Sequence, residues 1–365
     1  MALINLQNNI ESANNNCHII GLDLGYGYVK ISSGERNIKF LSIVGNPISN
    51  FAKTSAISSL DELLNTLTII YQGKTYYIGH NAQLNTRNGK ISLRQDKYDN
   101  DEQTKIKIMT ALALFTAEDQ YSAEFDVVLG LPVLEYYNQR DKINNMILNN
   151  NQPFEFTMKY GNKSVNKSIK CTNCKIISQG EGAYYNYILD SNAEIITTRS
   201  NNVAGLVVIT DSGFKTCDIV TMENGRYIET YCDQLNSGVV QIHNEILRLI
   251  MQNYNIKKEL KDIDEIVRNK QVFYSTKTYN IEHLIKQATE PFADNIIEAL
   301  YTIHNGELGN ISRILLTGGG AELTFEYIKE KLKNTVQVEK IYNSEFANAQ
   351  GYYKYGKFLK NNNMF

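Results

Sequence analysis

Two short segments constrain this chain most, because they repeat one layout in its two halves. Residues 19–31 read "IIGLDLGYGYVKI" and residues 207–220 read "VVITDSGFKTCDIV". Each is an apolar run that ends in an aspartate, followed by a glycine turn and a second apolar run. Such runs predict strands buried on both faces and joined as β-hairpins. The aspartates, Asp23 and Asp211, are 188 positions apart, so we expect two related domains.

Composition limits the class of protein. The chain has 365 residues, 42% of them hydrophobic, which is enough for two domains with cores of their own. A net charge of −2 and a pI near 6.3 disfavour direct nucleic-acid binding, which needs a basic excess. No apolar run approaches the roughly 20 residues that cross a bilayer, and the first residues lack a signal-peptide pattern. We therefore predict a cytoplasmic protein without membrane contact.

The five cysteines fit a reducing compartment better than a disulfide framework, because their number is odd and they are scattered. Cys171 and Cys174 form a CxxC pair, but structural zinc needs four ligands and no second pair lies at a suitable spacing. We assign this pair no metal or redox role.

Strand and helix patterns alternate along the chain, which predicts an α/β protein. Apolar residues recur at helical spacing in five segments, which are given below. A buried strand is expected at 124–132, stopped by Gly130 and Pro132. Residues 161–178 are polar, and their pattern predicts neither a strand nor a helix. The segments with helical spacing are 101–119, 135–148, 179–190, 237–254 and 290–305, and 348–360 closes the chain as another helix.

The paired hairpins suit a polyphosphate bound with a metal ion. Backbone N–H groups must approach the phosphates closely, which glycine permits because it lacks Cβ and tolerates positive φ. Aspartate at a strand end supplies the carboxylate, since Mg²⁺ keeps most of its waters and takes one or two carboxylates. We predict Asp23 and Asp211 as metal ligands, through water. We expect the bound phosphates to be contacted by Gly25, Gly27 and Lys30 of the first hairpin and by Gly213 and Thr216 of the second.

A third element, "TGGGAEL" at Thr317–Leu323, follows a predicted buried strand. Its small residues, Gly318, Gly319, Gly320 and Ala321, allow a flat group such as adenine or ribose to lie on the backbone. The Walker pattern is absent, and Gly25-Tyr26-Gly27 lacks the third glycine of the dinucleotide fingerprint. One Asp-x-Gly hairpin alone is usually a plain turn. Two of them with a glycine triplet, in this order, favour a nucleotide site.

These motifs resemble those of the actin, Hsp70 and sugar-kinase ATPase superfamily. "DLGYGYVK" is similar to its first phosphate loop, "DSGFKTCD" to its second and "LTGGGAEL" to its adenosine motif. Three further segments resemble the ParM-type, plasmid-segregating bacterial actins: "GLPVLEYYNQRDKI", "YYIGHNA" and "NAQGYY". The resemblance implies an actin-like two-domain fold of duplicated RNase H-like domains with a nucleotide cleft between them. It implies a flexible arm at 1–17, domain I at 18–178 plus 346–365, and domain II at 179–345.

The same resemblance implies ATP or GTP as substrate, Mg²⁺ as cofactor, polymerisation of the nucleotide-bound form, and hydrolysis that destabilises the filament. Partners would be further copies of the chain and a DNA-binding adaptor of the ParR type. Glu181 would orient the attacking water, with Gln179 as its rival, and Asp211 would also serve catalysis. The remaining nucleotide-binding positions implied are Tyr26, Tyr28, Ser212, Phe214, Lys215 and Gly238.

Phe214 departs from the family pattern, which has a second glycine there. Phenylalanine does not readily take positive φ. Either the second loop lies farther from the terminal phosphate, or Lys215 supplies charge in place of a backbone contact.

Two other functions on the same fold remain open. A small-metabolite kinase would need a catalytic aspartate beside a substrate pocket, and residues 132–178 do not supply one convincingly. A membrane-tethered scaffold would need an amphipathic membrane helix, but "ALINLQNNIE" near the N-terminus has no Lys or Arg. The segregating filament protein is therefore the preferred prediction.

Overall fold

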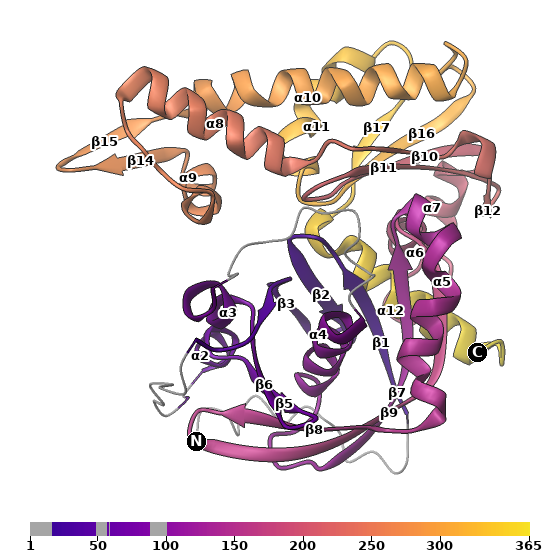
Figure 1. Ribbon diagram of the computed structural model, residues 1–365. Helices are drawn as coiled ribbons and strands as arrows, with labels where there is room; N and C mark the ends of the chain where they lie inside the picture. Colours follow the sequence, from indigo (N-terminus) through magenta and orange to yellow (C-terminus); the bar gives the residue numbers. More distant parts are fainter. Residues whose placement is uncertain (1–16, 49–56, 58, 88–100) are drawn as a thin grey trace. The chain divides into compact units, whose positions relative to one another are not determined.

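The computed structural model describes residues 17–48, 57, 59–87 and 101–365, which divide into two compact units (Figure 1). The first unit holds the described residues up to Ser178, together with Leu189–Ile195 and Asn348–Phe365. The second holds Gln179–Ile188 and Ile196–Ala347. Of the arm predicted at 1–17, all but Cys17 lies outside the described residues.

The first unit is built on a nine-stranded mixed sheet with the order β3-β2-β1-β7-β9-β8-β5-β6-β4. Its centre is parallel, since β1 and β9 both run parallel to β7, and its flanks are antiparallel. The strands are β1 His18–Leu24, β2 Tyr28–Ser32, β3 Asn37–Leu41, β4 Val44–Gly45, β5 Thr68–Tyr71, β6 Lys74–Ile78, β7 Ser122–Leu131, β8 Phe154–Tyr160 and β9 Lys163–Ser178.

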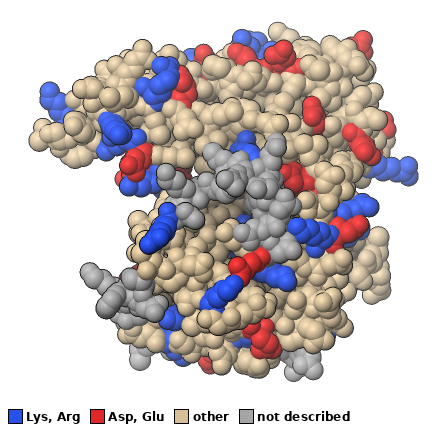
Figure 2. All heavy atoms as spheres, in the orientation of Figure 1, with Lys and Arg blue, Asp and Glu red and all other residues tan. Residues whose placement is uncertain are grey.

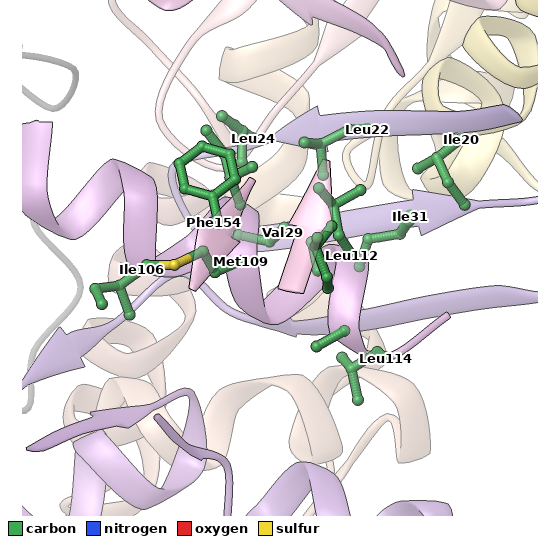
Figure 3. Packing of buried hydrophobic residues seen from close by; sticks show 14 of the residues in the cluster. Ile20, Leu22, Leu24, Val29, Ile31, Ile106, Met109, Leu112, Leu114 and Phe154 are labelled. Carbon is green, nitrogen blue, oxygen red and sulfur yellow. The ribbon is translucent and has the colours of Figure 1, made fainter. Parts of the chain in front are cut away.

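The core of this unit lies between the sheet and α4. Figure 3 shows Ile20, Leu22 and Leu24 of β1 facing Met109 and Leu112 of α4, all within one cluster of buried side chains. The helices are α2 Leu60–Asn65, α3 His80–Asn85, α4 Asp101–Ala113, α5 Val133–Leu148 and, at the end of the chain, α12 Ala347–Asn361. Alternate residues of β1 thus bury apolar side chains against α4.

The other face of β1 packs against α12, which approaches so closely that Gly21 has no room for a side chain. A Cβ at Gly21 would lie 2.0 Å from the Ala349 carbonyl oxygen. Gly130 of β7 is similarly covered, because a Cβ there would lie 1.7 Å from the Tyr352 hydroxyl oxygen. Both faces of the central strands are therefore buried, which explains the continuous apolar run that opens the first hairpin.

The second unit has a sheet of the order β12-β11-β10-β16-β17, with β13 paired to β11, and a separate β14-β15 hairpin. Its core lies between this sheet and the helices α8, α10 and α11. The strands are β10 Leu206–Ser212, β11 Cys217–Glu223, β12 Arg226–Tyr227, β13 Asp233–Leu235, β14 Gln271–Tyr274, β15 Lys277–Asn280, β16 Ile311–Thr317 and β17 Val338–Lys340. The helices are α6 Glu181–Ile188, α7 Thr197–Asn202, α8 Val239–Tyr254, α9 Ile263–Asn269, α10 Glu282–Ile303 and α11 Ala321–Leu332.

The two units repeat one strand pattern. In the first, β1 pairs with β2 as a hairpin and with β7 in parallel; in the second, β10 pairs with β11 as a hairpin and with β16 in parallel. The α/β class predicted from the sequence is confirmed, and the repeated strand pattern agrees with the two related domains expected from the paired hairpins.

Three details differ from the sequence prediction. The polar segment 161–178, for which the sequence predicts no element, contains the 16-residue strand β9. The pairing of β9 with β7 and β8 outweighs its polar composition. Strand β7 continues through Gly130 to Leu131 and ends only before Pro132. Helix α10 begins at Glu282, well before the predicted start at 290, and carries Pro291 inside it.

On the face drawn in Figure 2, Lys and Arg side chains are interspersed with Asp and Glu, as the small net charge leads one to expect. Within the described part of the chain, no helix combines the length and apolarity that a membrane crossing requires.

Candidate functional site

The first Asp-x-Gly hairpin places Asp23 near the end of β1. Asp23 is 3% exposed and lies opposite Lys30 of β2 in the register of the hairpin. The Lys30 ammonium Nζ donates to Asp23 Oδ2 at 3.4 Å. On its other side, Asp23 lies beside Gly130 of the parallel strand β7. The predicted residues Asp23 and Lys30 are thus brought together.

The turn of this hairpin is tight because strands β1 and β2 are joined by three residues. A Cβ at Gly25 would lie 2.6 Å from the Tyr28 carbonyl oxygen, so only glycine fits without a shift. The carbonyl of Gly27 accepts a hydrogen bond from the Ser42 N–H at 2.9 Å. Tyr28 lies beneath the ammonium of Lys39, which is 4.9 Å from the ring centroid.

Tyr26, at the tip of the turn, is buried and reaches a distant helix. Its hydroxyl donates to Oε1 of Glu135 at 2.9 Å, and Glu135 belongs to the first turn of α5. This hydrogen bond joins the turn of the first hairpin to the segment that follows β7.

The second hairpin places Asp211 near the end of β10, opposite Asp218 of β11 and beside Thr317 of the parallel strand β16. Asp211 is 5% exposed and Asp218 is 2% exposed. The turn is closed by the Gly213 N–H, which donates to the Thr216 carbonyl at 2.9 Å. The position of a carboxylate on a strand end beside a parallel neighbour is therefore the same in both units.

The glycine triplet packs directly on the end of β10. Gly318 has φ of +80°, and a Cβ there would lie 2.5 Å from both Asp211 Oδ1 and the Ser212 carbonyl oxygen. A Cβ at Gly320 would lie 2.6 Å from the Cβ of Ser212, and the Gly320 N–H donates to the Ser212 carbonyl at 2.9 Å. The structure thus joins the triplet and the second hairpin, and Ala321 begins α11 behind them.

The start of α8 holds the second loop from another side. The N–H groups of Val239 and Val240 donate to the carbonyls of Gly213 and Phe214 at 3.0 and 2.9 Å. Gly238 is required here, because a Cβ would lie 2.5 Å from the carbonyl carbon of Lys215 and 2.6 Å from the Phe214 oxygen. The predicted residues Gly213, Phe214, Lys215 and Gly238 therefore belong to one cluster.

Phe214 fits this loop without strain. Neither Gly213 nor Phe214 has positive φ, so the loop does not demand a second glycine for that reason. The glycines of both turns serve close approach, and the positive φ expected from the sequence is not used at Gly25 or Gly213. The ring of Phe214 packs edge-on against His243 of α8, with the centroids 6.5 Å apart. Burial lowers the pKa of His243, although Asp264 opposes this shift.

Asp218 and Gln234 extend the cluster in the second unit beyond the residues selected from the sequence. Gln234 Nε2 donates to Asp218 Oδ1 at 2.9 Å, and the Thr216 hydroxyl lies 3.5 Å from Asp218 Oδ2. Asp218 is the last residue of the motif "DSGFKTCD", so the motif could have indicated it. Nothing in the local sequence signals Gln234, which comes from β13.

Glu181 and Gln179 both belong to the second unit, at the start of α6. Gly180 between them has φ of +90°. A Cβ at Gly180 would lie only 2.9 Å from Cγ2 of Val220 in β11. Gln179 is buried, whereas Glu181 is partly exposed. The pKa of Cys232 is raised mainly by burial and further by the charge of Glu181. The catalytic role of Glu181 stays a prediction.

The donors described suit a hydrated Mg²⁺ rather than a closed all-protein metal site. Across the described ranges, no three His, Cys, Asp or Glu side chains are grouped so that they could hold a metal ion. Mg²⁺ usually keeps several waters and takes one or two carboxylates plus phosphate oxygens. Within the second unit, the carboxylates of Asp211 and Asp218 at paired positions of one hairpin are of the number and kind that this mode of binding uses.

Two family models match the chain. Residues 21–182 match the N-terminal domain of actin-like proteins, and residues 209–333 match the C-terminal domain of the archaeal actin homologue, MreB-like. The chain is therefore an actin-like protein. No curated protein matches it.

Solved structures confirm the actin-like two-domain fold predicted from the sequence. The chain is similar to a subunit of a 15-stranded ParM filament from Clostridium botulinum, with 23% identity, 94% of this chain and 99% of that chain covered, and a TM-score of 0.72. It is similar to Bacillus thuringiensis ParM with AMPPNP, at 16% identity, 95% and 100% coverage and a TM-score of 0.71. An archaeal actin homologue in complex with ADP matches at 18% identity, 93% and 99% coverage and a TM-score of 0.70. The fold is thus of the ParM type.

Proposed function

We propose that this protein binds and hydrolyses ATP or GTP with Mg²⁺, assembles into filaments in the nucleotide-bound form, and segregates plasmid DNA through a DNA-binding adaptor. One observation supports this most: each actin-like unit carries a buried strand-end aspartate directly beside a tight glycine turn, Asp23 with Gly25 and Asp211 with Gly213. Carboxylates and close backbone N–H groups are the two kinds of partner that a metal-bound polyphosphate requires.

In this proposal each hairpin supplies groups of its own that bind the nucleotide. The turn of the first hairpin presents its N–H groups to phosphate, and Lys30 adds a positive charge that also holds Asp23 in place. In the second unit, α8 and the glycine triplet fix the loop, so its backbone groups are oriented before phosphate binds. A bound Mg²⁺ would neutralise phosphate charge as it develops during transfer.

We assign Glu181 the role of orienting the attacking water, with Gln179 as the alternative. Its place at the start of α6, directly after Gly180, which packs against Val220 of β11, supports this assignment. Phosphoryl transfer depends mainly on positioning and charge stabilisation, so no covalent intermediate with the protein is expected.

The test is light scattering and negative-stain electron microscopy of the purified protein with Mg-ATP, with Mg-GTP and without nucleotide. Filaments that form only with a nucleotide support the proposal. Nucleotide turnover without assembly would favour a small-metabolite kinase of the same fold. Filaments that form only on lipid vesicles would favour a membrane-tethered scaffold.

A further inference from the structure

Tyr26 occupies an unusual position for the tip of a hairpin turn. It lies between two glycines, where a side chain would ordinarily be exposed, yet it is only 6% exposed. Its hydroxyl donates to Oε1 of Glu135 at 2.9 Å, across 109 positions of sequence. A buried tyrosine whose hydroxyl is held by a hydrogen bond restrains the backbone to which its side chain is attached.

Glu135 is held for this contact by the fold of the first unit. Strand β7 runs beside β1, with Gly130 next to Asp23, and ends at Leu131. Pro132 then caps α5, of which Glu135 is the third residue. A carboxylate in the first turn of a helix is stabilised by the helix dipole. Glu135 is thus placed at the same edge of the sheet as the phosphate loop.

The second oxygen of this carboxylate is an anomaly. Oε2 of Glu135 is buried, and within the described residues no donor reaches it. A buried carboxylate oxygen without a partner costs free energy, so such groups are rare unless they serve a function. Tyr26 therefore supplies a hydrogen bond that the carboxylate cannot replace from elsewhere in the described structure.

We propose that Glu135 is a positioning residue for nucleotide binding, which acts through Tyr26 to hold the first phosphate loop in the conformation that binds phosphate. This inference rests on the proposed function. The backbone N–H groups of the turn are oriented only while Tyr26 stays in its buried place. Loss of the contact lets the loop populate other conformations, and the apparent affinity falls by the fraction that remains competent.

The experiment measures binding of a non-hydrolysable ATP or GTP analogue with Mg²⁺ by calorimetry, beside the midpoint of urea unfolding. Tyr26→Phe keeps the ring and removes the hydroxyl, and Glu135→Leu removes the acceptor. We expect either change to weaken binding about tenfold, because a hydrogen bond to a charged group is worth at least that factor. The double variant should bind no more weakly than the single ones, since both remove the same contact.

Tyr76→Phe is the matched control. Tyr76 is also buried in the first unit, and its hydroxyl donates to Oε1 of Glu102 at 2.5 Å, away from the phosphate loop. The Tyr76→Phe variant should lose stability as Tyr26→Phe does, but it should bind the nucleotide analogue with wild-type affinity. If Tyr26→Phe also keeps wild-type affinity, the positioning role is refuted and the contact is only structural. If the wild-type protein binds neither nucleotide, the proposed function itself fails, and this inference with it.

Discussion

Gly318 offers a sharp test of how the second half of the site is built, because two forces act at one position. Its φ is +80°, a conformation that costs an L-residue about 1–2 kcal/mol. A Cβ there would also lie 2.5 Å from Asp211 Oδ1 and from the Ser212 carbonyl oxygen. Relief of such overlap by shifting well-packed groups typically costs about 1–3 kcal/mol. Gly318→Ala should therefore lower the free energy of unfolding by roughly 2–5 kcal/mol.

The neighbouring glycine supplies the comparison. Gly319 has no positive φ, and a Cβ built on it meets no described atom within 4 Å. Gly319→Ala should leave the free energy of unfolding nearly unchanged. If the nucleotide base or ribose lies on the triplet as we predict, the same change should weaken nucleotide binding, because the added methyl group stands on the open side.

The assay is urea unfolding followed by circular dichroism, with nucleotide affinity measured on the folded variants. A Gly318→Ala protein as stable as wild type would refute the assignment of this glycine to close packing against Asp211. Equal destabilisation by both substitutions would show that the whole triplet is packed, and would remove the open surface on which the base is expected to lie.

Three further outcomes are expected. Asp211→Ala should abolish metal-dependent nucleotide binding or turnover with the far-ultraviolet spectrum retained; turnover at the wild-type rate would contradict the paired-hairpin site. Glu181→Ala should slow phosphate release by roughly 10² to 10⁴ and leave nucleotide-dependent assembly intact; unchanged release would pass the role to Gln179. Burial lowers the pKa of Lys107 from 10.5 to about 8, so between those pH values the unfolded chain binds more protons and stability rises with pH. Lys107→Met has no charge to bury, so its free energy of unfolding below pH 8 should exceed that of wild type by up to about 3 kcal/mol. The variant should also gain less stability between pH 8 and 10.5 than wild type does. Equal pH profiles of the two proteins would show that Lys107 is solvated.

The hairpins and the triplet could be predicted from sequence because their signals are local. An apolar run, an aspartate and a glycine within a few residues define a strand end and a turn, whatever else the chain does. The structure places Asp23 beside Lys30, and Asp211 beside the glycine triplet. Their roles toward nucleotide and metal stay predictions.

The missed features depend on partners that are distant in sequence. The strand β9 reads as polar, but pairing with β7 on one side and β8 on the other makes it a central strand. The contact of Tyr26 with Glu135 spans 109 positions, and that of Asp218 with Gln234 spans 16 positions and joins β11 to β13. No periodicity within either segment encodes such a pair.

The duplicated strands hold their two loops in different ways, and this difference predicts how each half will respond to mutation. Asp23 lies beside Gly130, near the carboxyl end of β7, and Asp211 lies beside Thr317, at the carboxyl end of β16. In the first unit the segment that follows the neighbouring strand reaches the loop with a side chain, that of Glu135. In the second unit it reaches the loop with backbone, at Gly318 and Gly320. A side-chain contact can be weakened by removing one hydroxyl while the fold persists, whereas a backbone contact is disturbed only by adding atoms. We therefore expect changes in the first half of the site to alter affinity before stability, and changes at Gly318 to alter stability first.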